Sequence, residues 1–257
     1  MVAQFDAVKE ATDSFVKIFQ KRNWLLGAPT TAAGFLIGIV AVIFLFIAGF
    51  PSFFRTVTSS NQVPDISPAQ VALIVIGFTV LIMGAIVVSA FTNAWTLVAA
   101  DPVWLGRDPA FDRGFNRAAQ KLLPLCAYYV LVGLLSLVSI ITIVGPLIVA
   151  VLMMYGPCYI MFKDRSATEA IGDSFRLASE NLSPTIVLVL AFIAVYIVGF
   201  IVTAFVGLIP FVGIIGQLAF SWILSAYVAL AIVRFYDLLS SGRGSEPPYP
   251  IIPPTSS

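Results

Sequence analysis

Three carboxylates stand at comparable places in this chain, and carboxylates are the groups with which membrane proteins often bind cations or move protons. Asp101, Asp164 and Asp237 each follow the end of a long apolar run. They would either form a ring of acids that binds cations at one membrane surface or be solvated boundary residues, and we favour the second interpretation. In the middle of the apolar runs there is no acid and no base, and the chain has no histidine. Intramembrane proteolysis needs paired aspartates, a Ser–His dyad or a metal site, so we expect no catalytic residue, no cofactor and no metal.

A stripe of basic residues is the second candidate site. Arg113, Arg117 and Lys121 are four residues apart, and Arg107 precedes them. Like charges at this spacing repel weakly in an isolated helix. Anionic lipid headgroups would relieve the repulsion, at about 1 kcal/mol per basic residue near the surface. We expect these four side chains to contact lipid headgroups; ordinary anchoring of a positively charged membrane face is the alternative.

Polar and small residues within the apolar runs form the third group. Asn93 and Gln217 are the most costly to bury, because an unpaired amide in hydrocarbon costs several kcal/mol. They would line a polar cavity or, as we favour, form hydrogen bonds between helices. Gly34 and Gly38 form a small-xxx-small pair, which permits close helix packing within the chain or between copies.

Six long apolar runs carry these residues. The chain has 257 residues, of which 60% are hydrophobic and 11% charged, against about 25% charged in soluble domains. A soluble fold of this length could not bury so much apolar surface, so lipid must surround much of it. The runs cover about residues 25–50, 68–100, 122–144, 146–162, 184–208 and 211–236. Each is long enough for one crossing at 1.5 Å per residue, which predicts an all-α polytopic membrane protein with six transmembrane helices.

Proline and its neighbours mark where the runs begin. Ser67 before Pro68, with Gln70 three residues after the serine, predicts a capping box, and Ser183 before Pro184 repeats the cap-then-proline order. The second run exceeds what a bilayer needs, so it would project beyond the membrane or bend near Thr92. Breaks at residues 145–146 and 209–210 predict tight hairpins, whereas residues 51–68 form a polar connection.

The basic residues predict the orientation. With six crossings, thirteen of the 14 lysines and arginines fall on one side, and only Arg55 falls on the other. The positive-inside rule then predicts a multi-pass protein of the cell membrane with both termini cytoplasmic. The net charge of +1 gives no reason to expect a nucleic-acid partner.

Three segments align on a phenylalanine. The triplets are Asp13-Ser14-Phe15, Arg113-Gly114-Phe115 and Asp173-Ser174-Phe175, and each precedes an apolar hairpin by the same interval. Apolar residues at spacings of three, four and seven predict an amphipathic helix at each triplet. Ser166 and Glu169 predict a capping box at the start of the third of these helices. We expect a threefold internal repeat of one amphipathic cytoplasmic-side helix plus two spans, over about residues 3–100, 108–163 and 167–237. Phe15, Phe115 and Phe175 would anchor these helices at the membrane surface. The repeat implies pseudo-threefold packing or a sequential array.

Residues 159–182 carry a resemblance. They read Tyr-Ile-Met-Phe-Lys-Asp-Arg-Ser-Ala-Thr-Glu-Ala-Ile-Gly-Asp-Ser-Phe-Arg-Leu-Ala-Ser-Glu-Asn-Leu. This order of span, charged turn, Ala-rich helix and Asn resembles a broad group of prokaryotic membrane proteins of unknown function, including the membrane domain attached to some glycerophosphodiester phosphodiesterases. The resemblance is best over residues 155–200 and weaker over 100–145. It implies architecture; the phosphodiesterase activity does not carry over, because the soluble catalytic domain is missing.

The functional expectation combines these features. Residues 1–239 would form a single six-span domain, and residues 240–257 an extended Pro-rich cytoplasmic tail. We expect a non-catalytic integral membrane protein: a scaffold or accessory subunit of a membrane assembly, or a bilayer organiser. The alternative is a transporter or channel for an apolar or amphipathic solute such as lipid. Expected partners are the lipid bilayer with its anionic lipids, and a protein bound through the tail or the apolar outer surface.

Overall fold

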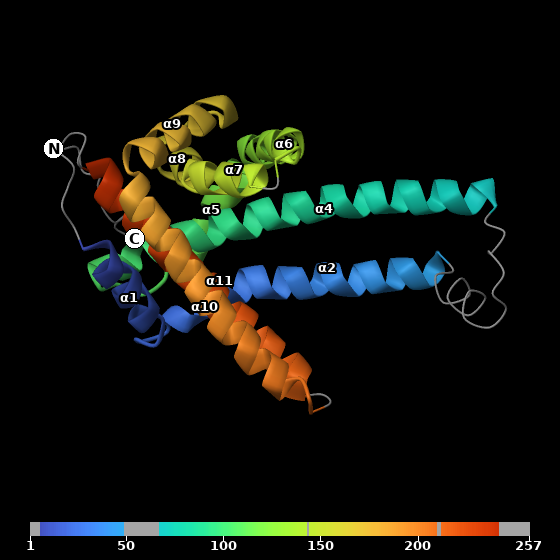
Figure 1. The fold of residues 1–257 in the computed structure, drawn as a ribbon, viewed down its shortest axis with the longest axis horizontal. Helices are drawn as coiled ribbons and strands as arrows, with labels where there is room; N and C mark the ends of the chain where they lie inside the picture. Colours follow the sequence, from blue (N-terminus) through green and yellow to red (C-terminus); the bar gives the residue numbers. More distant parts are fainter. Residues whose placement is uncertain (1–5, 49–66, 143, 210–211, 242–257) are drawn as a thin grey trace, which may run out of the picture.

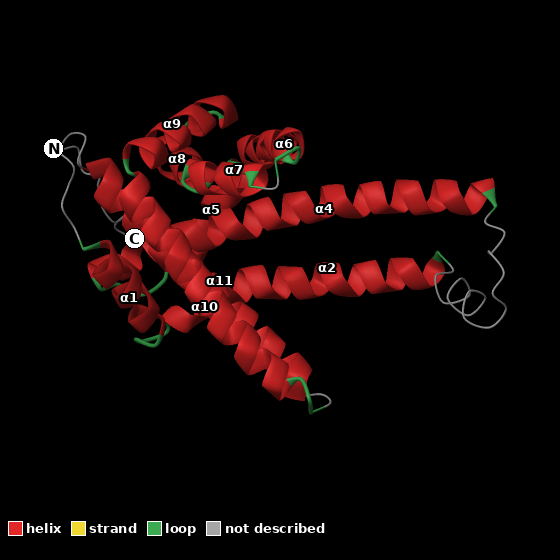
Figure 2. Cartoon of the chain, viewed as in Figure 1, coloured by secondary structure: helices red, strands yellow, loops and turns green. Residues whose placement is uncertain are grey.

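Every regular element in the described part of the chain is a helix (Figure 2). The computed structural model describes residues 6–48, 67–142, 144–209 and 212–241. In chain order the elements are α1 (Ala7–Ile18), the 3-10 helix η1 (Asn23–Gly27), α2 (Ala28–Ile47), α4 (Pro68–Ala100), the 3-10 helix η2 (Asp101–Leu105), α5 (Phe111–Gln120), α6 (Leu122–Ser139), α7 (Gly145–Met153), α8 (Gly156–Lys163), α9 (Ala167–Glu180), α10 (Leu182–Val206) and α11 (Val212–Ser241).

Six helical stretches of the described chain are long and apolar enough to cross a membrane. They are Asn23–Ile47, Pro68–Leu105, Leu122–Ser139, Gly145–Lys163, Leu182–Val206 and Val212–Ser241. The all-α class and the six candidate spans are therefore confirmed, and they are compatible with a multi-pass membrane protein.

The predicted helix starts are correct in two places and wrong in one. Ser67 caps α4 in a capping box with Gln70, and Ser166 does the same for α9 with Glu169. Ser183 does not cap α10, because this helix already begins at Leu182 after Asn181. The side-chain amide of Asn181 instead donates to the carbonyl of Leu177 in α9 (2.9 Å), so no side chain caps α10.

The fourth apolar run, which was expected to form one helix, is divided into α7 and α8. Pro157 cannot donate a hydrogen bond to the carbonyl of Met153, and its ring clashes with a helical carbonyl at that position. The structure accordingly separates α7 from α8. The freed carbonyl of Met153 accepts a hydrogen bond from the Tyr128 hydroxyl, and the hydroxyl of Ser174 donates to the Leu152 carbonyl (2.8 Å). Both bonds satisfy backbone groups that lipid could not.

Two other predictions concern segments that lie mostly outside the described residues. The connection predicted over residues 51–68 lies outside them except for its last two positions. The Pro-rich tail also lies outside them, apart from Ser240 and Ser241, which continue α11 as a helix.

One end of the molecule, called the base below, contains most of the buried residues. It consists of α1, α5, α9, η1 and η2, together with α8 and the adjoining parts of α4 and α11. In α4 the buried residues lie between Ala90 and Ala100, and in α11 between Ala226 and Leu239. Because α4 has 33 residues, it is about 50 Å long. It passes Thr92 as one continuous helix and ends inside the base, and its length exceeds the thickness of a hydrocarbon core, about 30 Å.

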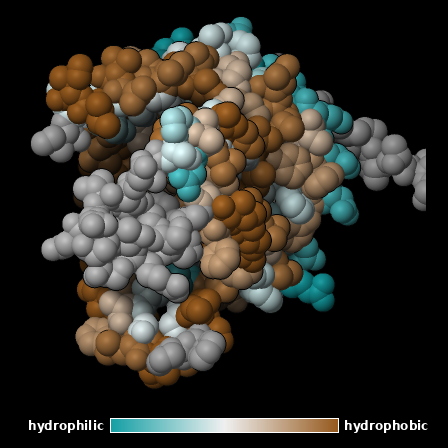
Figure 3. Space-filling view, turned by 90° about the vertical axis from the view of Figure 1, so that its right-hand side faces the viewer, coloured by the Kyte–Doolittle hydropathy of each residue, from teal (hydrophilic) through white to brown (hydrophobic). Residues whose placement is uncertain are grey.

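The spanning helices form three hairpins that leave the base in different directions. α2 pairs with α4, α6 with α7 and α10 with α11. In Figure 1, α2 and α4 run side by side away from the base, whereas α10 and α11 cross the view obliquely. Their outer halves, the parts farther from the base, are largely exposed: no residue of α4 before Ala90 is buried. In Figure 3, hydrophobic residues cover much of the coloured surface, and hydrophilic residues lie along its right-hand edge and in smaller groups at the top and left of the centre.

The short helices α1, α5 and α9 join the hairpins at the base. α5 packs on α4, α9 on α7 and α8, and α1 on α11 and α10. In each, the small residue before the aligned phenylalanine is buried: Ser14, Gly114 and Ser174. A Cβ at Gly114 would lie 2.5 Å from the backbone oxygen of Trp95, so only glycine permits this approach of α5 to α4. The buried face of each helix is therefore centred on the residue before the phenylalanine, whereas the sequence predicted an apolar face that includes the phenylalanine.

Candidate functional site

Asp164 is the centre of a three-residue ion cluster at the base. It follows α8 in the left-handed conformation (φ 57°), which aspartate tolerates better than most residues. Its carboxylate lies 2.8 Å from Nη2 of Arg117 and 2.5 Å from Nζ of Lys121. Hydrogen bonds from Lys121 and Arg117 lower the pKa of Asp164 below its ordinary value. The cluster therefore connects the end of α8 to the junction of α5 and α6.

Asp101 and Asp237 occupy a more enclosed part of the base. The Asp101 side chain is 7% exposed and lies 3.9 Å from Nη1 of Arg113. The expectation that it is a solvated boundary residue is therefore wrong, because its side chain is buried at the junction of α4 and η2. Asp237 lies within electrostatic range of Asp101, and its Oδ1 is buried without a hydrogen-bond partner in the described part of the chain. Asp101 and Asp164 each lie near different cations, whereas Oδ1 of Asp237 has no hydrogen-bond partner among the described residues, so the three acids have different surroundings.

Arg234 and Glu10 fasten the last helix to the first. Nε of Arg234 donates to Oε2 of Glu10 (2.7 Å) and Nη2 donates to Oε1 (3.2 Å), a bidentate pair between α11 and α1. Arg234 also lies 4.9 Å from the ring centre of Trp104, and Lys17 lies 4.5 Å from the same ring. Trp104 donates its indole N–H to the carbonyl of Leu230 (3.1 Å), so this site joins α1, η2 and α11.

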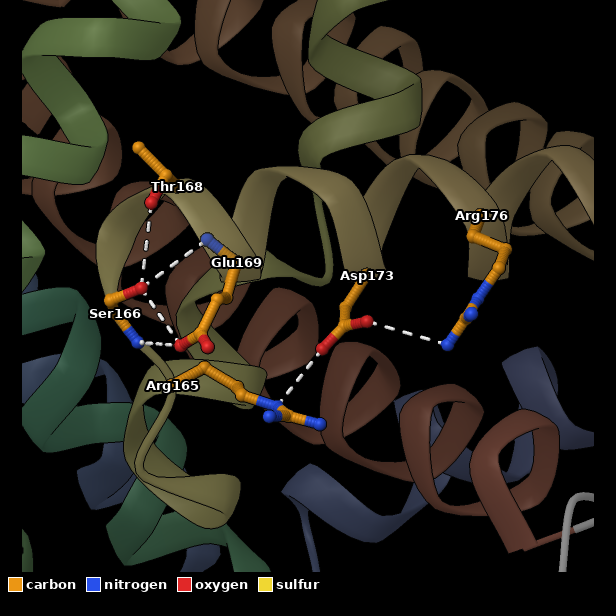
Figure 4. A network of polar contacts seen from close by, with 6 residues as sticks. All are labelled: Arg165, Ser166, Thr168, Glu169, Asp173 and Arg176. Carbon is orange, nitrogen blue, oxygen red and sulfur yellow. Dashed lines mark hydrogen bonds and ion pairs between the residues drawn. The ribbon is translucent and has the colours of Figure 1, made fainter.

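A further polar network lies at the start of α9 (Figure 4). Asp173 lies 3.1 Å from Nε of Arg165 and 3.4 Å from Nη2 of Arg176. Ser166 donates its backbone N–H to Oε2 of Glu169 (2.9 Å), and this bond lowers the pKa of Glu169. The network fixes the turn between α8 and α9, because Arg165 precedes the helix and Asp173 lies two turns inside it.

The predicted headgroup residues divide into two kinds. Arg113, Arg117 and Lys121 have carboxylate partners within the chain, so much of their charge is already balanced. Arg107 is exposed and, within the described residues, forms no ion pair. It lies beside Lys21, whose Nζ donates to the carbonyl of Gly106 (2.7 Å). Lipid contact by this group remains a prediction, and Arg107 is its most available member.

Three apolar grooves lie between helices, two between spanning helices and one between α1 of the base and α10. The groove between α2 and α4 has a volume of about 1040 Å³, the one between α2 and α11 about 600 Å³, and the one between α1 and α10 about 490 Å³. The first extends from Trp95 and Phe111 at the base to Phe44 and Gly77 in the outer halves. Apart from Phe111 of α5, the first two grooves are lined only by helices that are long and apolar enough to cross a membrane.

The polar and small residues named from the sequence are distributed over different places. Asn93 is half-buried near the base end of α4, whereas Gln217 is exposed in the outer half of α11. Neither lines any of these three grooves. Gly34 and Gly38 line the groove between α2 and α11, and a Cβ on either would meet nothing within 4 Å. Their close packing is therefore not used within the described chain, which leaves packing between copies as a prediction.

The aligned phenylalanines lie at the edges of the buried faces. Phe115 is 47% and Phe175 50% exposed, and Phe15 is half-buried against Tyr227. Phe115 also makes edge-to-face contacts with Phe91 and Trp95. Each ring thus has one side on the protein and one side available to the surroundings.

The side chains that connect distant elements at the base were not predicted from the sequence. Glu10, Trp104 and Tyr128 were not singled out, and Ser174 was named only as part of an aligned triplet, although each bonds an element distant in sequence. A signal was present at Ser174, since serine or glycine precedes all three aligned phenylalanines. The pairing of Glu10 with Arg234 had no local signal.

The ion pairs and hydrogen bonds of the base hold helices together. The ion pairs of the described residues mostly connect different elements, and the described residues include no cluster of three or more His, Cys, Asp or Glu residues suited to a metal. Comparison of the chain with protein-family models, with curated proteins and with solved structures finds no match.

Proposed function

We propose that this chain is a non-catalytic integral membrane protein that acts as a scaffold or accessory subunit of a membrane assembly, or as an organiser of the bilayer. The observation that carries the proposal is the difference between a base held together by ion pairs and three hairpins with exposed apolar outer halves. Such hairpins offer long apolar flanks to lipid or to the helices of another protein. The charged groups of the base hold α1, α5, α8 and α11 together, and this structural role is enough to explain their presence.

The proposed placement sets the base on the cytoplasmic side of the cell membrane, with both termini there. It is supported by the basic residues of α1, α5 and α9, all of which belong to the base. The half-exposed rings of Phe15, Phe115 and Phe175 would then dip into the interface. Replacing Phe115 and Phe175 with aspartate should weaken membrane retention; unchanged extraction and folding would contradict this placement.

The proposed architecture is a threefold repeat closed into a ring. Each short amphipathic helix would dock on the second span of the preceding unit: α5 on α4, α9 on α7 and α8, and α1 on α11. The contact of α1 with α11 favours closed pseudo-threefold packing over a sequential array. The resemblance of residues 155–200 to membrane domains attached to phosphodiesterases belongs to this proposal, and concerns architecture alone.

Transport of a lipid or another amphipathic solute is the second candidate. The groove between α2 and α4 favours it, since an apolar channel open to the side suits a lipid better than an ion or a sugar. Reconstituted vesicles distinguish the two: movement of labelled phospholipid between leaflets, above that of protein-free vesicles, would support transport. The scaffold proposal expects none.

The decisive experiment is purification of the tagged native protein in a mild detergent, followed by identification of everything retained. Stoichiometric protein partners support the subunit role, and retained lipid without transport supports bilayer organisation. A bare chain with neither lipid nor protein would contradict the scaffold proposal.

A further inference from the structure

Two contacts hold α2 and α4 together on either side of the middle of the groove between them. Near the base, the hydroxyl groups of Thr30 and Thr96 lie 3.2 Å apart and hold the two helices together. In the outer halves, the ring of Phe44 packs edge-to-face on Phe78 and covers Gly77. Between these contacts lies Gly84, where an added Cβ would meet nothing within 4 Å. The hollow is therefore a defined feature of this hairpin.

The volume of the groove decides what kind of occupant fits. A transmembrane helix of 20 residues, about 10 Å wide and 30 Å long, fills about 2400 Å³, more than twice the 1040 Å³ of the groove. Water is excluded as a filling, because an apolar wall provides no hydrogen-bond partners. Leaving the space empty would forfeit dispersion contacts along both helices. Flexible hydrocarbon chains remain as the filling that matches the walls.

The base end of the groove carries positive charge. Leu25 and Phe111 line that end, with Lys21 and Arg22 just before the first and Arg107 just before the second. The bond from Lys21 to the Gly106 carbonyl brings these two segments together. Within the described residues none of these three cations has a carboxylate within 4 Å, although Asp108 and Asp112 belong to the same segment.

Trp24 and Trp95 place this end of the groove at the depth of lipid headgroups. Trp24 is 48% exposed and Trp95 lines the groove itself. Tryptophan is enriched where hydrocarbon meets headgroups, so an occupant with its chains in the groove would present its polar end to Lys21, Arg22 and Arg107.

We infer that the α2–α4 groove is a binding site for one anionic phospholipid, with its acyl chains against Gly84 and its phosphate group near Arg107, Arg22 and Lys21. This inference rests on the proposed function, since it names the lipid class that the scaffold organises. The apolar walls select hydrocarbon over water, the volume of the groove is too small for a whole helix, and the cations select a negative headgroup over a neutral one.

Native mass spectrometry of the full-length protein tests the site. The protein is reconstituted with equal amounts of phosphatidylglycerol and phosphatidylcholine, and retained lipid is counted per chain. We expect one retained phospholipid, at least threefold enriched in phosphatidylglycerol. Gly84→Leu should reduce occupancy at least fivefold by filling the groove. Gly133→Leu in α6 is the matched control, because its Cβ also meets nothing within 4 Å and Gly133 does not line the groove.

The headgroup is tested separately by charge. Arg107→Gln should leave a phospholipid bound but lower the enrichment in phosphatidylglycerol to near one. Lys9→Gln removes the same charge from an exposed position on α1 and should leave the enrichment unchanged. Unchanged enrichment in Arg107→Gln would overturn the headgroup assignment.

A measurement on the unaltered protein keeps the test independent of variant folding. Phosphatidylglycerol with a photoactivatable acyl chain should cross-link to peptides of α2 and α4. Equal labelling of α6 and α10, or Gly84→Leu with wild-type lipid occupancy, would overturn the site. Cross-links from α2 and α4 to a second copy or to a partner protein would also overturn it, but would leave the scaffold proposal standing. Leaflet-to-leaflet lipid movement would overturn the scaffold proposal without touching the site.

Discussion

The base and the outer halves of the hairpins follow different packing rules. In the base, Ile18, Leu26 and Tyr236 are fully buried, whereas Ile141 is 89% and Leu208 80% exposed in the outer halves. An exposed apolar side chain costs nothing in lipid, so the outer halves have no solvent-driven reason to pack together. The base has no such freedom, because its short helices have charged side chains that need ionic partners and helix ends whose backbone groups need hydrogen-bond partners. The difference teaches that one end of this molecule specifies how all six spans are held.

The largest expected effect is steric and belongs to the base. Gly114→Ala places a Cβ 2.5 Å from the backbone oxygen of Trp95 and should destabilise the protein by about 3 kcal/mol. Gly133→Ala in α6 meets open space and should be neutral, or stabilising by about 0.5 kcal/mol through helix propensity. Unfolding in mixed micelles, followed by circular dichroism, measures both. Equal shifts for the two variants would remove the distinction between the regions.

The ion pair between α1 and α11 should come next. Arg234→Gln removes a bidentate bond to Glu10 and a cation above Trp104, with an expected loss of about 2 kcal/mol in unfolding free energy. A double-mutant cycle with Glu10→Gln isolates the coupling. The exposed pair of Arg176 with Asp173 is the control, and its coupling should stay below about 0.5 kcal/mol. Comparable couplings would show that exposure does not matter here.

The break between α7 and α8 should be sensitive to Ser174. The hydroxyl of Ser174 donates to the Leu152 carbonyl and accepts from the backbone N–H of Tyr155 (3.2 Å). Ser174→Ala leaves both groups without this partner and should cost about 1.5 kcal/mol. Thr79→Ala in the outer half of α4 loses only a bond to its own helix, at Val75, and should have almost no effect. Equal stability of the two variants would contradict a structural role for the break.

The smallest effect should come from Asp164, and it should depend on pH. Because its pKa is lowered in the folded state, the cluster stabilises the protein above the unfolded pKa of about 3.9, and this contribution is lost as pH falls through the lower, folded pKa. Its side chain is 57% exposed, so solvent screening keeps the contribution below about 1 kcal/mol. Asp164→Asn should therefore lower stability slightly at pH 7 and match the wild type in strong acid. A difference that persists below about pH 2 would exclude the ionic explanation.

Local signals predicted local structure well. The apolar runs and the serine–proline start at Ser67 predicted α4 over the residues it occupies, and the capping box at Ser166 predicted the start of α9. These features depend on neighbours within four residues, which a sequence displays directly. The break at Pro157 was visible in the same way but was overlooked, because the run around it is apolar throughout.

Long-range contacts were not predictable in this way. Arg113, Arg117 and Lys121 form a basic stripe in the sequence, yet Asp101 and Asp164 approach them only when α5 packs on α4 and the end of α8 lies beside it. The expected headgroup site therefore divided into paired cations and the available Arg107. Likewise, Gly34 and Gly38 are close in sequence, but nothing local shows that they line a groove.

The sequence by itself determined the all-α class and the six apolar stretches long enough to cross a membrane, because hydrophobicity, caps and prolines act along the chain within a few residues. Only the tertiary structure decided which helices meet, that α1 returns to α11, and that α2 and α4 part to leave a groove. The physical reason is that lipid satisfies almost any exposed apolar surface equally. The choice of helix contacts therefore depends on a few small residues and ion pairs that lie far apart in the chain.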